Sequence, residues 1–249
     1  MPRFLYIANW KMTMHANAAI AFATEHGHAL STLAQHNEAT IIVCPSFVVL
    51  DAIIQLLQNS HLAVGAQDCS AYASGAYTGQ VSAQSLQEIG CTYTLVGHRE
   101  RREYFQETNE MISQKVARLL ECNIQPIICI GQAKHHAMHD IYPELEKQLV
   151  PVLAVLAAHN VQSCIIAYEP AAHIGTHMPL DAASIERIVI FIKQMVARTL
   201  PTGHVQVVYG GGVNSASVAS LKSITLLDGF LIGQASTDFQ NFEKIVSCR

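Results

Sequence analysis

The sequence has no long hydrophobic run and no block of basic residues, although half of its 249 residues are hydrophobic. Its apolar runs, such as residues 149–158, end well short of the roughly 18 residues that a membrane helix needs. No small-residue cleavage pattern follows the opening run FLYIANW, so we expect neither a signal peptide nor a membrane partner. Fifteen basic and nineteen acidic residues give a net charge of −4, which argues against nucleic acid as a partner.

The seven cysteines form no C-x-x-C pair, and their odd number argues against a complete disulfide framework. We therefore expect a reducing, cytoplasmic location. The tract His135, His136 and His139 lacks a cysteine partner and an H-E-x-x-H pattern, so we interpret it as solvated and predict no metal site. No G-x-G-x-x-G turn follows the first apolar run, so no cofactor is implied.

Short apolar runs rich in β-branched residues recur along the chain. They begin at Phe4, Ala39, His61, Tyr93, Ile124, Ser163, His204 and Leu227. Runs that are uniformly apolar, without a period of two, favour strands that are covered on both faces, as in a parallel sheet.

The segments between these runs accommodate one helix each. In residues 181–200 the apolar side chains follow the spacing of one helix face, and Asp181 is placed as the N-cap. Strand and helix alternating eight times allow a doubly wound open sheet or a closed (β/α)₈ barrel. A barrel typically needs about 250 residues. We therefore expect an α/β protein with a single TIM-barrel domain over residues 1–249.

Polar residues stand where several predicted strands end. The first strand ends at Asn9 and Lys11, the fourth at His98 and the sixth at Glu169, and glycines follow the last two strands. Any one of these is more often a turn or cap residue, but a barrel gathers its strand ends at a single active-site face. A carboxylate, a neutral donor and a cation are the groups that proton transfer next to a carbonyl requires. We therefore predict Glu169 as base, His98 as donor and Lys11 as cation.

Short patterns over nearly the whole chain resemble the triosephosphate isomerase family. They are NWKM at 9–12, GAQD at 65–68, GAYTG at 75–79, LVGH at 95–98, ERR at 100–102, CIG at 129–131, AYEP at 167–170, IGT at 174–176, YGG at 209–211 and DGFLIG at 228–233. This resemblance implies interconversion of dihydroxyacetone phosphate and D-glyceraldehyde 3-phosphate in glycolysis and gluconeogenesis, without a metal or cofactor, by a homodimer.

The resemblance also implies individual roles. Glu169 would shuttle the proton and His98 would polarise the carbonyl, while Asn9 and Lys11 contact the substrate and Glu100 pairs with Lys11. Backbone groups would hold the phosphate at Gly175, Gly212, Gly233 and Gln234. Residues 68–81 resemble the dimer loop, with Thr78 near its tip reaching into the partner subunit.

Several positions depart from the family pattern. The lid hinge, Val-Trp-Ala in the family, reads Ala171, Ala172 and His173 here, and a glycine is replaced by His177. Gln132 replaces the glutamate that the hinge tryptophan can bond, so both members of that contact have changed together. We therefore expect a functional lid with altered opening kinetics.

Arg99 replaces the serine that follows the catalytic histidine in the family. One hypothesis is that its guanidinium pairs with Glu169 in the absence of substrate and lowers the pKa of that carboxylate. The alternative is that Arg99 points to solvent or pairs with another acid. At the level of function, the alternatives are a weakly active or non-catalytic relative that binds triose phosphate, or an isomerase of another small phosphorylated aldose or ketose.

Overall fold

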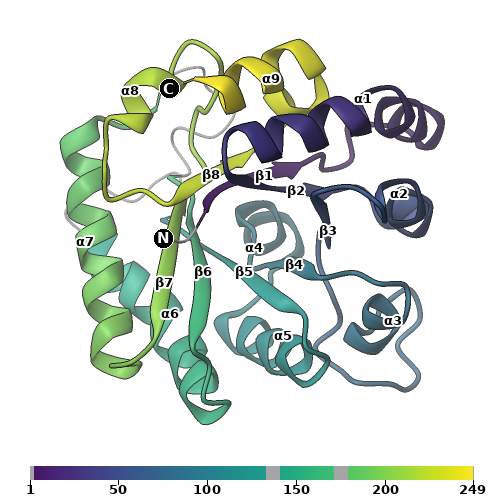
Figure 1. Ribbon diagram of the computed structural model, residues 1–249. Coiled ribbons are helices and arrows are strands. Elements are labelled where there is room, and N and C mark those ends of the chain that lie inside the picture. The colour runs from purple at the N-terminus through teal and green to yellow at the C-terminus, as the bar shows by residue number, and fades with distance from the viewer. Residues whose placement is uncertain (1–2, 133–140, 171–178, 249) are drawn as a thin grey trace.

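The computed structural model describes residues 3–132, 141–170 and 179–248, and within them eight parallel strands close into a barrel (Figure 1). The strands are β1 (Phe4–Asn9), β2 (Ala39–Cys44), β3 (Leu62–Ala66), β4 (Tyr93–Val96), β5 (Gln125–Ile130), β6 (Ser163–Tyr168), β7 (His204–Tyr209) and β8 (Gly229–Ile232). Each strand pairs in parallel with the next, and the pairing of β1 with β8 closes the ring. The predicted fold class and all eight predicted strands are confirmed.

Helices surround this barrel on its outside (Figure 1). In the described residues they are α1 (Ala16–His36), α2 (Leu50–Leu57), α3 (Ala83–Glu88), α4 (Arg99–Phe105), α5 (Asn109–Glu121), α6 (Ile141–Ala158), α7 (Ala182–Thr199), α8 (Val218–Lys222) and α9 (Phe239–Ser247). As predicted, Asp181 caps α7, because its Oδ1 accepts the Ser184 N–H at 2.9 Å. The prediction of one helix per interval was wrong after β4, where two helices, α4 and α5, follow. No helix of the described residues is long and apolar enough to cross a membrane.

The strands are buried on both faces, which explains their uniformly apolar sequences. In β1, Leu5 and Ile7 belong to the apolar cluster inside the barrel. Tyr6 and Ala8 point the other way and belong to the larger cluster between the strands and the helices. Apolar packing therefore fills the barrel itself, and it leaves the carboxyl ends of the strands as the place where polar side chains gather.

A buried cluster of charges joins α4, α5 and the chain that follows β3. Lys115 is only 2% exposed, and its Nζ lies 2.7 Å from Asp68 Oδ1 and also pairs with Glu107. Arg101 Nε lies 2.8 Å from Asp68 Oδ2. Desolvation by burial raises the pKa of Asp68 against the opposing effect of Lys115. The cluster attaches the start of the 68–81 loop to the two helices that follow β4.

We expect Lys115→Met to destabilise the protein by about 3–5 kcal/mol, because it leaves two buried carboxylates without their main cation. Lys193→Met is the control, since Lys193 pairs with Asp228 at 2.9 Å but its side chain remains 32% exposed. That pair contributes at most about 1 kcal/mol. Urea unfolding at matched protein concentration measures both changes. Equal losses in the two variants would contradict a structural role for the buried cluster.

Candidate active site

One cleft of about 670 Å³ opens at the carboxyl ends of the barrel strands. It is lined by nine predicted site residues: Asn9, Lys11, His98, Arg99, Glu100, Glu169, Gly212, Gly233 and Gln234. Strand geometry explains the convergence. Asn9 ends β1, Glu169 directly follows β6, and Gly233 directly follows β8, so residues far apart in the sequence meet at one face.

Glu169 and His98 are in direct contact. His98 Nε2 lies 3.0 Å from Glu169 Oε1, and the two side chains are 6% and 3% exposed. The other ring nitrogen, Nδ1, accepts the backbone N–H of Glu100 at 3.3 Å. Because Nδ1 is an acceptor, the neutral ring carries its proton on Nε2. His98 therefore presents an N–H donor to the interior of the cleft.

Both carboxylate oxygens of Glu169 have a donor. Besides the contact with His98, Oε2 accepts the backbone N–H of Arg99 at 3.1 Å. Burial by itself raises the pKa of Glu169, whereas His98, the Arg99 N–H and the nearby Lys11 lower it, and the net direction is downward. In this arrangement Glu169 is an ionised carboxylate, as a general base must be.

Lys11 is held in an uncommon backbone conformation, with φ at 49°. Its N–H donates to Asn9 Oδ1 at 3.1 Å, and its Nζ lies 2.5 Å from Glu100 Oε1, as expected. Gln67 Nε2 donates to the carbonyls of Lys11 at 2.8 Å and Cys44 at 2.9 Å. Gln67 therefore positions Lys11, a role that our sequence reasoning missed although Gln67 stands in the quoted GAQD pattern.

The glycines that follow β7 and β8 leave room in the cleft. Gly212 has φ at 62°, which favours glycine. A Cβ at Gly211 would lie 2.6 Å from Tyr209 Oη and from Pro170 Cγ, and one at Gly210 would lie 3.2 Å from Glu169 Cγ. Gln234 has no positive φ, so replacing glycine there costs no backbone strain. Gly175 lies outside the described residues.

The hypothesis of an ion pair between Arg99 and Glu169 was wrong. The guanidinium of Arg99 pairs with Glu103 instead, which is the alternative of a different acid partner. The reason is helical spacing, because α4 begins at Arg99 and brings the residue four positions on to the same face. Arg99 contacts Glu169 through its backbone N–H alone.

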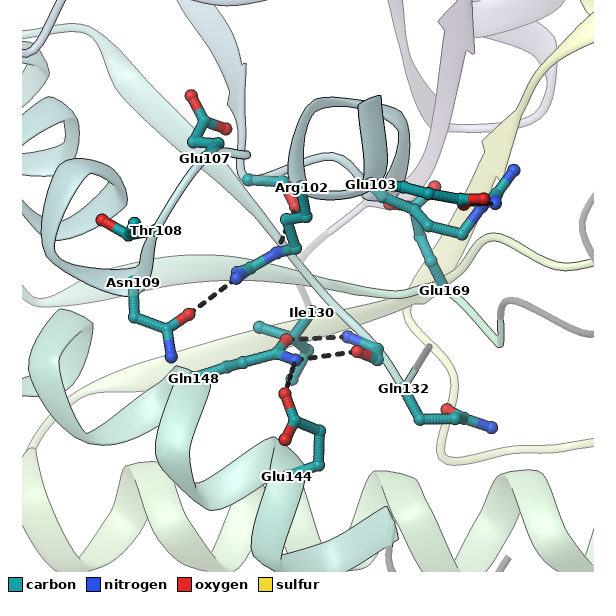
Figure 2. Close-up of a pocket in the computed structure, with 13 residues that line it drawn as sticks. Arg102, Glu103, Glu107, Thr108, Asn109, Ile130, Gln132, Glu144, Gln148 and Glu169 are labelled. Carbon is teal, nitrogen blue, oxygen red and sulfur yellow. Dashed lines mark hydrogen bonds and ion pairs between the residues drawn. The ribbon is translucent and has the colours of Figure 1, made fainter. Parts of the chain in front are cut away.

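A second cavity of about 580 Å³ shares Glu169 and Arg99 with the cleft (Figure 2). Gln132 lines it and accepts the Tyr168 hydroxyl at 3.1 Å. Gln148 also lines it and clamps Gly131 through two hydrogen bonds, which Figure 2 shows as dashed lines. The hinge residues Ala171, Ala172, His173 and His177 lie outside the described residues, so the altered hinge stays a prediction.

The residues of the predicted dimer loop, 68–81, do not line the cleft. Thr78 is exposed, and the rings of Tyr72 and Tyr77 stack with their centroids 3.9 Å apart. Both tyrosines are also exposed. In the part of the chain that the structure describes, no group of three or more histidine, cysteine or acidic side chains is placed to hold a metal ion. The histidines 135, 136 and 139 lie outside that part.

Comparison with known proteins gives full-length matches. The family model described as triosephosphate isomerase matches residues 4–249. The triosephosphate isomerase of Cupriavidus taiwanensis is 37% identical over 250 residues, covering 98% of this chain and 99% of that protein. Those of Endomicrobium trichonymphae and Aquifex aeolicus are 32% and 34% identical, and each match covers at least 98% of both chains.

We expect the pKa of Glu169 in the ligand-free protein to lie below that of an ordinary glutamate, so that it stays ionised into mildly acidic solution. Its ionised form is stabilised by N–H donors, and His98→Leu removes one of them while burial remains. The pKa should therefore rise in this variant. NMR titration with ¹³C-labelled glutamate measures both values. A pKa that falls or stays constant in His98→Leu would contradict this account of the site.

Proposed function

Because the chain belongs to the triosephosphate isomerase family, we propose that it interconverts dihydroxyacetone phosphate and D-glyceraldehyde 3-phosphate in the cleft that holds Glu169 and His98. The chain is an aldose–ketose isomerase by its full-length similarity to that family. The observation that carries the assignment of roles is the contact of a buried carboxylate with an imidazole N–H, 3.0 Å apart, beside a lysine.

The phosphate of the substrate binds at the glycine-rich end of the cleft. The backbone at Gly212, Gly233 and Gln234 lines this end, and backbone N–H groups hold a phosphate whatever the side chain. With the phosphate there, the carbonyl of the substrate lies towards His98 and Lys11. By the family resemblance, the lid residue Gly175 adds a further backbone donor.

Catalysis begins when Glu169 leaves its two donors and takes a proton from the carbon next to the carbonyl. The electron pair of that C–H bond forms the enediolate, whose oxyanion is stabilised by the Nε2–H of His98 and the ammonium of Lys11. Glu169 then returns the proton to the neighbouring carbon, while His98 moves protons between the two oxygens. Triosephosphate isomerase is itself the type case of a glutamate base paired with a neutral histidine.

The exchange of partners also adjusts the strength of the base. While its oxygens accept from His98 and Arg99, the ionised form of Glu169 is stabilised and its pKa is low. Once the substrate carbonyl takes over the His98 N–H, the carboxylate remains buried but loses these donors. Burial without hydrogen bonds raises the pKa of a carboxylate, so Glu169 becomes a stronger base when the substrate is in place.

A homodimer through residues 68–81 is part of the proposal. Its support is the family resemblance of this loop, its exposed tyrosine pair, and the buried charges at Asp68 that attach its start. The loop follows Gln67, which positions Lys11, so a partner that holds the loop also stabilises the site. We further propose a cytoplasmic location, since the seven cysteines are free thiols.

Glu169→Gln is expected to lower kcat by about 10²–10⁴-fold, because the amide cannot accept the proton. Retained binding of a phosphate-bearing substrate analogue would show that the cleft is intact. A coupled assay with glyceraldehyde 3-phosphate measures turnover, and the exposed Glu88→Gln on α3 is the control. A folded wild-type protein that binds triose phosphate without turnover would refute the proposal and support a non-catalytic relative. Turnover of another phosphorylated aldose or ketose in preference would favour the remaining alternative.

Thr78→Arg is expected to shift the protein from dimer to monomer, because a long cation at the loop tip is desolvated without a partner. Sedimentation at several concentrations measures the change. Thr24→Arg is the control, since Thr24 is exposed on α1. An unchanged dimer in Thr78→Arg, or a monomeric wild type, would contradict the proposed interface.

A further inference from the structure

Arg99 carries a positively charged guanidinium and lines the same cavities as the catalytic carboxylate of Glu169. Its backbone N–H lies 3.1 Å from Glu169 Oε2, and both residues line both cavities. The arginine side chain starts at the adjoining Cα and is long enough to turn towards the same carboxylate. Its side chain is only 12% exposed, so any salt bridge that it forms with Glu169 would be shielded from water.

The guanidinium is also short of hydrogen-bond partners. Its Nε is buried and has none within the described residues, and its ion pair is with Glu103 through Nη1. Buried donors are strongly driven to find acceptors. Glu169 is buried and would be a better acceptor for the guanidinium than Glu103, its partner through Nη1, whose side chain is 39% exposed.

Glu103 is the carboxylate that the Arg99 guanidinium contacts in the structure. It stands four residues after Arg99 on α4, and Figure 2 shows Glu103 and Glu169 on the same side of the second cavity. Among the groups that lower the pKa of Glu169 are the His98 side chain, the Arg99 backbone N–H and Lys11, and the guanidinium of Arg102 also interacts with this carboxylate.

We propose that Glu103 is a positioning residue of the isomerase, which holds the Arg99 guanidinium along α4 and so leaves Glu169 free to move to the substrate. This inference rests on the proposed function of Glu169 as the base. Glu103 does not touch substrate in this proposal, and it acts only through Arg99. Without Glu103, the guanidinium pairs with Glu169 and competes with the substrate for the base.

A purely structural role for the pair makes a different prediction. If the pair only stabilised α4, then losing either partner would have the same effect, and losing the second after the first would add little. In our proposal the harm comes from a freed guanidinium, so removing Arg99 as well repairs the damage done by removing Glu103. A double-mutant cycle separates the two cases.

The test measures kcat/KM for Glu103→Gln in the full chain, with and without Arg99→Ser. We expect Glu103→Gln alone to lower kcat/KM by about 10- to 100-fold, the range of one hydrogen bond to a charged group. The double variant Glu103→Gln with Arg99→Ser should recover kcat/KM to within about twofold of the wild-type value. A double variant that is as impaired as Glu103→Gln would instead indicate a purely structural pair. Equal losses in the two backgrounds, or no loss in either, would overturn the proposal.

A second readout comes from the pH profile. A guanidinium that pairs with Glu169 favours the ionised carboxylate, so the acidic limb of kcat/KM should move to lower pH in Glu103→Gln and return when Arg99→Ser is added. Glu103→Asp keeps the charge and should lose less activity than Glu103→Gln. An acidic limb that stays in place in Glu103→Gln would count against the proposal.

Glu121→Gln is the matched control. Glu121 pairs with Arg118 at 2.7 Å on α5, so its variant also removes one carboxylate from a helical ion pair, and its kcat/KM should stay at the wild-type value. The outcomes remain distinguishable from failure of the proposed function. A wild-type protein without isomerase activity refutes the function, whereas an active wild type with an unaffected Glu103→Gln refutes only this inference.

Discussion

The Glu169 carboxylate, buried and held by two N–H donors, is the contact on which the rest of the site depends. Burial without donors raises the pKa of a carboxylate, so that it is more readily protonated before any substrate arrives. His98 and the Arg99 backbone N–H lower the pKa of Glu169 and so favour the ionised form. Both donors come from the chain just after β4, while Glu169 comes from the end of β6. The closed barrel is what brings these two strand ends together.

Close packing around this contact explains residues that do no chemistry. A Cβ at position 131 would lie 2.0 Å from the Glu169 carbonyl oxygen. Only glycine therefore fits at this position directly after β5, where the backbone runs close to that of Glu169. Gln148 on α6 then clamps the backbone of Gly131 through both its N–H and its carbonyl. The backbone that carries the base is therefore held in place by the Gly131 segment and Gln148.

Much of the site was predictable because its members stand at strand ends that can be recognised in the sequence. Asn9, His98 and Glu169 each end or closely follow a uniformly apolar run, and barrel topology then requires them to meet. Gln67 follows β3 in the same way, yet its role is to bond two backbone carbonyls. Amide side chains carry no sequence signal for such a contact. The cluster around Lys115 was equally hidden, since lysine is almost never fully buried.

The sequence by itself determined the eightfold alternation of strand and helix, the side chains at the mouth of the barrel and the family to which the chain belongs. These follow from local patterns, because apolar periodicity and short motifs are read along the chain. Only the tertiary structure decided the partner of Arg99. Glu103 and Glu169 are both carboxylates within its reach, and the choice depends on the direction in which α4 starts after His98. Helical spacing makes Glu103 available to Arg99, but the choice of Glu103 over Glu169 also depends on how α4 lies relative to the end of β6, and packing between distant elements sets that arrangement.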